Sequence, residues 1–588
     1  MSKWVVANKK ADFKALAAQL HIDQVLVRVL RNRDLTTYEE MKDFLYGDDS
    51  AMHDPFLLND MEKAVQLTLD AITAGKRIRV IGDYDVDGVT STFILVKGLK
   101  SIGANVDYAI PNRIRDGYGL NEHLIDCAIE DGVEFIITCD NGIAAVEALH
   151  KAKELGITCL VTDHHEVPYS EVDGERRYTY PEAAAIINPK RHDSTYPFKG
   201  ICGAMVAYKL ILAIATKTTV SPEIIRELRE MAGLGTVCDV MELKDENRIL
   251  VKKALNDMNN TVNVGIRALR RVCEIEDKPL SSYHLGFIIG PCINATGRLE
   301  NASMSLELLL ETDIRNAIYK ATELKRLNDL RKSMTEEGMN KAFELIDSGK
   351  YDTDRVLVVF LPELHESLAG IVAGRVRERY YKPALVITRG EDGLKGSGRS
   401  IDSYDMYAEL SRVSDIFDKF GGHKMAAGVS LREDRLEELR DRLNGNCTLT
   451  EEDLIEKITI DVPMPLNYVS ERFITELDIL EPFGVGNPKP VFADKVLLLQ
   501  GKTMGKTGDM ARFTATKESG GQFTLVLFGG LDKMKEKISS KYGEDAVDTI
   551  FAGGYRGTSP VEMSVIYYPQ INEYRGNISL QYVISDFA

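Results

Sequence analysis

The fold of this chain is decided by the stretch Asp83-Tyr84-Asp85-Val86-Asp87-Gly88. Residues 77–82 before it are rich in β-branched side chains and end in glycine, which is typical of a buried strand. Residues 89–96 after it begin a helix, with Thr90 or Ser91 near its N-terminus. Three carboxylates therefore lie on a strand–helix turn, where open parallel sheets bind ligands. A divalent cation would relieve their repulsion, but a solvated turn that caps the helix explains this stretch alone equally well.

Two later strands are predicted to end in similar residues. Residues 134–139 lead into Asp140-Asn141-Gly142, and residues 157–162 lead into Asp163-His164-His165-Glu166. Because the carboxyl ends of parallel strands meet at one edge of a sheet, three strands would deliver Asp or His to the same place. The added imidazoles favour Mn²⁺, with Mg²⁺ still compatible. Together the three stretches predict a site for two metal ions.

Composition places the chain among globular proteins of several domains, with 588 residues, 44% of them hydrophobic and 28% charged. No segment has the length of a membrane span and the N-terminus begins no signal peptide, so we expect a cytoplasmic protein without membrane contact. The eight cysteines show no CxxC pair and are expected to be reduced thiols. The net charge of −17 argues against a generally basic nucleic-acid coat but is compatible with a local basic channel.

We expect an α/β protein in five parts. These are a helical N-terminal extension (1–60), a parallel-sheet domain (61–299), a connecting segment with one long helix (300–350), a smaller α/β domain (351–450) and a C-terminal β-barrel (457–588). Apolar residues at three- and four-residue spacing predict the long helix over 313–347, with Asp313 as its cap and Gly349 at its end.

The C-terminal part is predicted to be rich in short strands, and five strands would suit an OB-fold. The predicted strands are residues 496–499, 511–516, 523–528, 549–552, 562–568 and 578–584. OB-folds stack the bases of single strands on aromatic side chains, but aromatics on a barrel strand more often point into the core. The aromatic candidates are Phe513, Phe523, Phe528, Tyr568 and Tyr574.

Several loops are predicted to offer phosphate-binding groups. Arg113 and Arg115 follow the strand predicted at 105–110, where they would hold a phosphate or pair with the acidic cluster. Two glycine-rich stretches, 395–400 and 421–428, are predicted to be polar loops, and they carry Arg399, His423 and Lys424. Asp239 follows a helical pattern and is either a further metal ligand or an ordinary helix-end aspartate.

These motifs, in this order, resemble a known superfamily. The stretches 83–88, 140–142 and 163–165 are similar to the DHH phosphoesterases, and 396–400 with 421–423 resembles the DHHA1 domain that accompanies them. The stretches 290–299 and 482–492 resemble the RecJ family of single-strand-specific 5′→3′ DNA exonucleases. The resemblance extends from about residue 40 to the C-terminus.

The resemblance implies roles for particular residues. Two divalent cations, Mn²⁺ or Mg²⁺, would be held by Asp85, Asp87, Asp140, His164 and Asp239, with Asp140 bridging them. His165, Asp140 and Asp83 would be catalytic, with His165 contacting the scissile phosphate. The single strand would be bound by Arg113, Asn294, Arg298, His365, Arg399, Gly422 and His423. The chain departs from the family pattern at Ile81, where many members have His, and at Cys292, where Arg is common.

The implied activity is release of 5′-mononucleotides from single-stranded DNA in repair and recombination, by a monomer that works with a helicase and a single-strand-binding protein. One alternative is a phosphodiesterase of short oligonucleotides or cyclic dinucleotides, although such an enzyme has no need of the C-terminal barrel. The other is a non-catalytic nucleic-acid-binding relative, although a scaffold has no need to keep crowded Asp and His residues.

Overall fold

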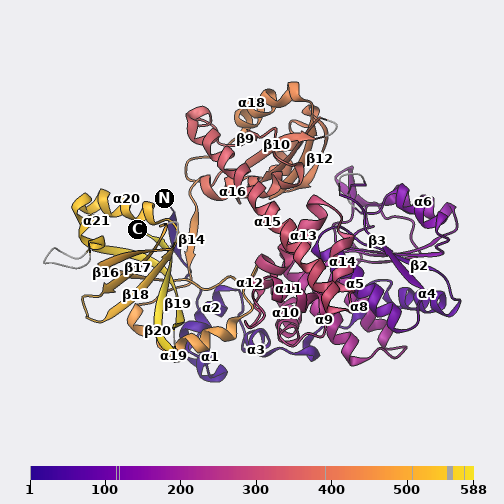
Figure 1. Cartoon of the computed structure of the whole chain (residues 1–588), viewed down its shortest axis with the longest axis horizontal. Coiled ribbons are helices and arrows are strands. Elements are labelled where there is room, and N and C mark those ends of the chain that lie inside the picture. Colours follow the sequence, from indigo (N-terminus) through magenta and orange to yellow (C-terminus); the bar gives the residue numbers. More distant parts are fainter. Residues whose placement is uncertain are drawn as a thin grey trace. The chain divides into compact units, whose positions relative to one another are not determined.

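The computed structural model describes residues 2–113, 116–117, 119–390, 393–505, 508–552, 561–574 and 576–588. The chain divides into two compact units, whose elements are labelled in Figure 1. Unit 1 comprises residues 52–241 and 245–456, and unit 2 comprises residues 2–51, 242–244 and 457–588. Within the described ranges, no helix is both long enough and apolar enough to cross a membrane.

The first sheet of unit 1 is parallel and has five strands. Their order across the sheet is β3 (Val106–Ala109), β2 (Ile78–Ile81), β4 (Phe135–Cys139), β5 (Thr158–Thr162) and β8 (Ala185–Ile187). The chain passes from β2 to β3 on one side and then crosses to β4 on the other, so the strand order reverses at β2 and β4. Such a reversal is where open parallel sheets bind ligands. The strands predicted directly before the three motifs are confirmed as β2, β4 and β5.

Helices cover both faces of this sheet, as the complete burial of β4 requires. On one face, α6 (Glu122–Glu130) and α7 (Val146–Glu154) share a core with Ile136 and Val161. Helices α5 (Val86–Ser101) and α8 (Gly203–Ala215) also contact the strands. The remaining elements before residue 310 are α4 (Met61–Thr73), β6 (Tyr169–Val172), β7 (Glu175–Tyr178), α9 (Pro222–Cys238), α10 (Asp245–Met258), α11 (Val264–Val272), α12 (Ser282–His284), α13 (Gly290–Leu299) and α14 (Ser303–Leu309).

The long helix predicted over 313–347 is confirmed as α15 (Ile314–Leu345). Its 32 residues span about 48 Å at about 1.5 Å each. Asp313 caps it, because Oδ1 accepts the backbone N–H groups of Arg315 and Asn316 at 3.0 Å. Gly349, with φ of 91°, lies at the end of the helical run that follows α15.

The second sheet of unit 1 is mixed, with the order β12 (Phe417–His423), β13 (Ala426–Leu431), β11 (Gly393–Arg399), β10 (Ala384–Gly390) and β9 (Leu357–Phe360). Only β9 and β10 run parallel among its pairs. The end of α15 and α16 (Ala369–Tyr380) pack on one face, while α17 (Met406–Ser411) and α18 (Leu436–Asn446) pack on the other.

The prediction of two glycine-rich loops in this domain is wrong. Residues 395–399 lie within β11, and residues 421–428 form most of the β12–β13 hairpin. Glycine is present for packing between strands: a Cβ on Gly396 would lie 2.3 Å from Ile387 Cδ1, and one on Gly422 would lie 2.3 Å from the Ala426 carbonyl oxygen. Atoms of neighbouring strands therefore occupy the space that a side chain at these two positions would need.

Unit 2 contains the predicted barrel. Its sheet has the order β15 (Val462–Pro463), β16 (Phe492–Met504), β17 (Met510–Thr516), β18 (Gln522–Phe528), β20 (Asn577–Phe587) and β19 (Val561–Tyr574), and β19 pairs back with β16. Five strands therefore close into a ring, as an OB-fold requires. Helices α19 (Glu471–Leu477), α20 (Leu531–Tyr542) and α21 (Glu544–Phe551) complete this part.

The strand predicted at 549–552 is wrong, because these residues end α21 and follow it. Val547, Ile550 and Phe551 recur at helical spacing and pack against the barrel core. Of the candidate stacking residues, Phe513 and Tyr568 are buried, as expected for core positions, and Phe528 is 59% exposed. The side chain of Tyr574 lies outside the described residues.

The N-terminal segment belongs to the core of unit 2. Strand β1 (Lys3–Val6) pairs in parallel with β14 (Lys457–Ile460). Helices α1 (Phe13–Leu20), α2 (Gln24–Asn32) and α3 (Tyr38–Tyr46) contribute buried side chains to the same hydrophobic cluster as the barrel strands.

A buried arginine links the N-terminal helices to the segments that precede the barrel strands. Arg33 donates from Nε to Asn487 Oδ1 at 2.6 Å and from Nη1 to the Val29 carbonyl at 2.9 Å. Its Nη2 donates to the Pro488 carbonyl, and Nη1 lies 3.4 Å from Asp461 Oδ1. Hydrogen bonds to every part of this fork hold α2 against the segment that precedes β16.

We predict that Arg33→Met lowers the free energy of unfolding of unit 2 by about 3–5 kcal/mol, because Asp461 loses its partner in a nearly closed environment. Trp4 is the single tryptophan of the chain and lies in unit 2. Urea denaturation followed by its fluorescence therefore reports on this unit.

The matched control is Arg472→Met, which removes an exposed arginine paired with Glu476 in the same unit. We expect its effect to stay within about 0.5 kcal/mol. Equal effects of the two substitutions would contradict a structural role for Arg33.

Candidate metal centre

Seven acidic and histidine side chains meet at the carboxyl edge of the first sheet. Three come from the turn between β2 and α5, one from the end of β4, two from the end of β5 and one from the end of α9. They are Asp83, Asp85, Asp87, Asp140, His164, His165 and Asp239, and they form three groups whose possible ligand atoms lie within 4.8 Å of one another.

His164 lies at the centre of one group. Its Nε2 is 3.0 Å from Asp140 Oδ1, 3.6 Å from Asp87 Oδ2 and 3.7 Å from Asp239 Oδ2. Asp140 also groups with Asp83 and Asp85 on its other side. Asp140 is therefore shared by two sets of possible ligands, which is the position that a bridging carboxylate needs.

The backbone fixes the carboxylates of the β2–α5 turn. Asp85 is the N-cap of α5 and accepts the Gly88 N–H at 3.0 Å. The two oxygens of Asp87 accept the N–H groups of Gly203 and Ala204, at 2.7 and 2.8 Å, at the start of α8. Gly203 has no space for a side chain, since a Cβ there would lie 2.6 Å from that of Asp140. Residues 203 and 204, which sequence patterns did not mark, thus position Asp87.

Asp163 is a second contributor that the sequence interpretation did not assign a role. It accepts the backbone N–H groups of Ile143, His164 and His165 at 2.7–3.1 Å, and its Oδ1 lies 2.7 Å from His165 Nδ1. Burial acts to raise the pKa of Asp163, but the bond and charge of His165 outweigh it and lower the pKa to about 2. Asp163 is an ionised positioning residue, and its place directly before His164 and His165 was the available signal.

The two histidines differ in charge. Burial lowers the pKa of His164, which favours the neutral imidazole that binds metals. Burial also acts to lower the pKa of His165, but the hydrogen bond to Asp163 and nearby carboxylate charges raise it to about 9. Its side chain is 43% exposed, against 7% for His164. His165 is therefore a reachable cation, and His164 is an enclosed neutral imidazole.

The carboxylates are too crowded to be stable as bare anions. Burial, followed by the charges of neighbouring carboxylates, raises the pKa of Asp83, Asp85 and Asp140, and it raises the pKa of Asp239 to about 8. Within the described residues, Asp83 Oδ2 and both ring nitrogens of His164 have no hydrogen-bond partner. Carboxylate oxygens with a neutral imidazole match the preference of Mn²⁺, and of Mg²⁺ for the oxygens.

The residues predicted to bind the strand lie in two places. Asn294 Oδ1 accepts the Val86 N–H at 3.2 Å, so Asn294 supports the Asp-rich turn. Arg298 is partly buried, donates to the Ser367 carbonyl at 2.7 Å, and has its pKa lowered to about 10 by burial and by the charges of Arg113 and Arg331. These arginines form a positive patch next to the acidic cluster, and Arg115 lies outside the described residues.

The other predicted strand-binding residues belong to the second sheet domain. His365 Nδ1 lies 2.8 Å from Ser367 Oγ, beside the contact of Arg298. Arg399 donates to Ser397 Oγ at 3.1 Å and lies close to Gly370, near the start of α16. Gly422 and His423 lie on β12, and no described hydrogen bond or ion pair joins either of them to the acidic cluster.

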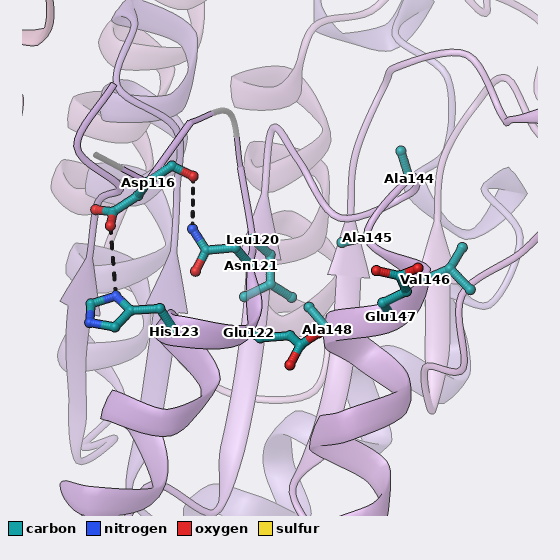
Figure 2. A pocket seen from close by; sticks show the side chains of 10 residues that line it. All are labelled: Asp116, Leu120, Asn121, Glu122, His123, Ala144, Ala145, Val146, Glu147 and Ala148. Carbon is teal, nitrogen blue, oxygen red and sulfur yellow. Dashed lines mark hydrogen bonds and ion pairs between the residues drawn. The ribbon is translucent and has the colours of Figure 1, made fainter. Parts of the chain in front are cut away.

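A pocket of about 710 Å³ opens in the same domain at the N-terminal ends of α6 and α7 (Figure 2). Asp116 bonds through its main-chain oxygen to Asn121 Nδ2 at 3.0 Å, and its Oδ1 lies 3.7 Å from His123 Nδ1. The lining also carries Glu122 and Glu147. Three carboxylates around one opening are unsuited to a phosphate backbone.

Known proteins share the domains in this order. The model of the DHH family N-terminal domain matches residues 77–236, that of the DHHA1 domain 353–448, and that of the RecJ OB domain 460–586. The structure of RecJ from Thermus thermophilus in complex with Mn²⁺ is similar, with a TM-score of 0.81 and 26% identity over 100% of this chain and 79% of that one.

Single-stranded-DNA-specific exonuclease RecJ of Bacillus subtilis is 35% identical over 88% of this chain, which spans 64% of that protein. RecJ of Escherichia coli is 34% identical over 90% of both chains. A chain that matches RecJ over nine-tenths of both lengths, with all three domains in place, belongs to the RecJ family.

Proposed function

We propose that this chain is a metal-dependent exonuclease that hydrolyses single-stranded DNA in the 5′→3′ direction and releases 5′-mononucleotides in DNA repair and recombination. The observation that carries the proposal is the shared position of Asp140 between two sets of possible ligands. The family membership supports the substrate class. The closed barrel of unit 2 favours long single strands over short oligonucleotides or cyclic dinucleotides.

Two divalent cations, Mn²⁺ or Mg²⁺, are proposed to bind Asp85, Asp87, Asp140, His164 and Asp239, with Asp83 at the same cluster. When bound, they supply a water of lowered pKa and offset charge at the phosphorus. The protein holds the donors rigid through the N–H groups of Gly88, Gly203 and Ala204.

His165 is proposed to act on the scissile phosphate. One ring nitrogen is held by Asp163, and the side chain is 43% exposed. With a pKa of about 9, His165 is a cation at neutral pH. It can therefore donate a hydrogen bond to a phosphate oxygen and stabilise charge that develops on the leaving oxygen.

The strand's phosphates are proposed to contact Arg113, Asn294, Arg298, His365, Arg399, Gly422 and His423. The proximity of Arg113 and Arg331 to Arg298 supports this, because both of their charges act on Arg298. A local patch reconciles phosphate binding with the net charge of −17. The cytoplasmic location, the monomeric state and the helicase and single-strand-binding partners remain predictions from the sequence.

We predict that Asp140→Asn lowers turnover roughly 10³-fold or more, because a shared ligand loses its charge. The measurement is release of label from 5′-labelled and 3′-labelled single strands in Mn²⁺, Mg²⁺ and EDTA. Label should leave the 5′ end first, and EDTA should abolish release. Circular dichroism should show that the variant is folded.

The matched control is Asp434→Asn, which changes an exposed aspartate of the same unit. It should retain the parent rate. Parent-like turnover of Asp140→Asn in saturating Mn²⁺ would refute the bridging role.

We also predict that stability without metal falls as pH rises from 6.5 to 9. Asp239, with a pKa of about 8, and His165, with a pKa of about 9, hold more protons in the folded than in the unfolded chain across this window. Their contribution is therefore lost as pH rises through these values. With Mn²⁺ the slope should reverse, because deprotonated ligands bind metal more tightly.

Thermal unfolding in EDTA and in Mn²⁺ measures both slopes. Asp239→Asn should raise the melting temperature in EDTA at pH 9 by a few degrees and remove part of the gain with Mn²⁺. A variant less stable than the parent in EDTA would show that the carboxylates do not repel one another.

A further inference from the structure

An aromatic pair stands exposed on the surface of unit 1. Tyr283 is 60% exposed and Phe287 is 65% exposed. Their ring centroids are 5.1 Å apart and their planes are inclined by 23°, so the two rings are stacked. They lie one turn apart, on α12 and on the π-helical turn Leu285–Ile289. Large apolar groups gathered on a surface mark a binding site more often than scattered ones do.

The segment that carries the pair contacts the end of α9. The Leu285 carbonyl accepts the Cys238 thiol at 3.6 Å, and a Cβ on Gly290 would lie 2.4 Å from Cys238 Sγ. The aromatic segment therefore packs against the last turn of α9, which ends at Asp239. Val240, directly after Asp239, is 65% exposed and has φ of 59°. A β-branched residue rarely adopts this strained conformation, which clusters at functional sites.

Two cationic side chains, Lys278 and the buried Arg270, lie near the pair. His284 lies between the two aromatic residues, and burial and the charges of Lys278 and Arg270 lower its pKa. Arg270 donates to the carbonyls of Met258 and Glu276, and these contacts do not neutralise its charge. Aromatic rings together with cations bind nucleic acid by stacking bases and attracting the backbone.

We propose that Tyr283 and Phe287 form a stacking platform for a base of the single strand whose phosphates meet the metal centre. The proposal rests on the proposed function. The occupant is single-stranded DNA because the segment of the platform packs against the helix turn that leads to Asp239, and the charge of Lys278 acts on His284 between the two rings. Stacking is indifferent to base identity, as removal of successive nucleotides requires.

The test uses the full-length enzyme with Mn²⁺. Tyr283→Ala and Phe287→Ala should each raise KM for a long single strand by about 5- to 100-fold, as loss of one stacked base predicts, with kcat nearly unchanged. Phe287→Trp should restore KM, because it returns a ring. Tyr319→Ala, which removes a 77% exposed tyrosine of α15, should leave KM unchanged.

An abasic scan separates stacking from a structural effect. A strand with one abasic position should show raised KM with the parent enzyme when that position faces the platform. The double alanine variant should show no such position. A parent-like KM of both alanine variants, or a penalty that persists in the double variant, overturns the proposal. Absence of nucleotide release by the parent enzyme would instead overturn the proposed function.

A second observation concerns two thiols that lie close together. Cys273 and Cys292 lie with their Sγ atoms 3.9 Å apart, the first at the end of α11 and the second in α13. Cys292 is buried, and Cys273 is partly exposed. The contact with Cys292, followed by the charges of Lys325 and Lys332, lowers the pKa of Cys273. A partly exposed, acidic thiol beside a second thiol is the usual arrangement of a redox-sensitive pair.

We infer that peroxide joins Cys273 and Cys292 in a reversible disulfide that slows the enzyme. The Cys273 thiolate attacks peroxide to give a sulfenic acid and hydroxide. The Cys292 thiol then attacks that sulfur, the S–S bond forms, and water leaves. A dithiol reverses the reaction. Closing 3.9 Å to about 2 Å displaces α13, which carries Asn294 and Arg298.

Peroxide treatment before metal addition tests this inference. Mass spectrometry of alkylated peptides should show the 273–292 crosslink, the rate on DNA should fall at least threefold, and dithiothreitol should restore it. Cys273→Ser should be insensitive, while Cys447→Ser should respond like the parent. Absence of the crosslink, a crosslink without a change in rate, or equal loss in Cys273→Ser overturns the inference.

Discussion

The fold of unit 1 holds several carboxylates close together although their negative charges repel one another. Burial first, and the charges of neighbouring carboxylates second, oppose ionisation of Asp83, Asp85, Asp140 and Asp239. Backbone N–H groups at the starts of α5 and α8 hold the turn in place, and the reversal of strand order brings β2 and β4 side by side. The need to hold the carboxylates close together explains much of the packing around the site. It explains the absence of a side chain at Gly203, where a Cβ would collide with Asp140.

The division of work between the two adjacent histidines follows from burial. His164 is enclosed among three carboxylates and has the neutral form that suits a metal ligand. His165, one residue further, reaches the surface and is kept charged by Asp163. The end of β5 thus supplies a neutral imidazole, a cation and the carboxylate that orients the cation.

Sequence patterns predicted the parallel sheet, the long helix and most barrel strands because these follow from local periodicity and from polar residues at strand ends. They failed where tertiary packing decides. The glycines of β11 and β12 indicated loops. They are instead strand positions where atoms of Ile387 and Ala426 occupy the space that a side chain would need. Residues 549–552 have the apolar content of a strand but complete an amphipathic helix. The supporting roles of Gly203 and Ala204 were not visible, because their backbone N–H groups meet Asp87 from a distant element.

The N-terminal strand and helices share a core with the C-terminal barrel, and Trp4 donates to Asp586 at 2.7 Å. Unit 1 is therefore an insertion within unit 2 along the chain. On the ribosome, residues 2–51 emerge long before their partners after residue 457, because the whole of unit 1 is made in between. At roughly 5–20 residues per second, the apolar faces of α1 to α3 stay uncovered for tens of seconds. During that interval unit 1 can fold before unit 2 is complete.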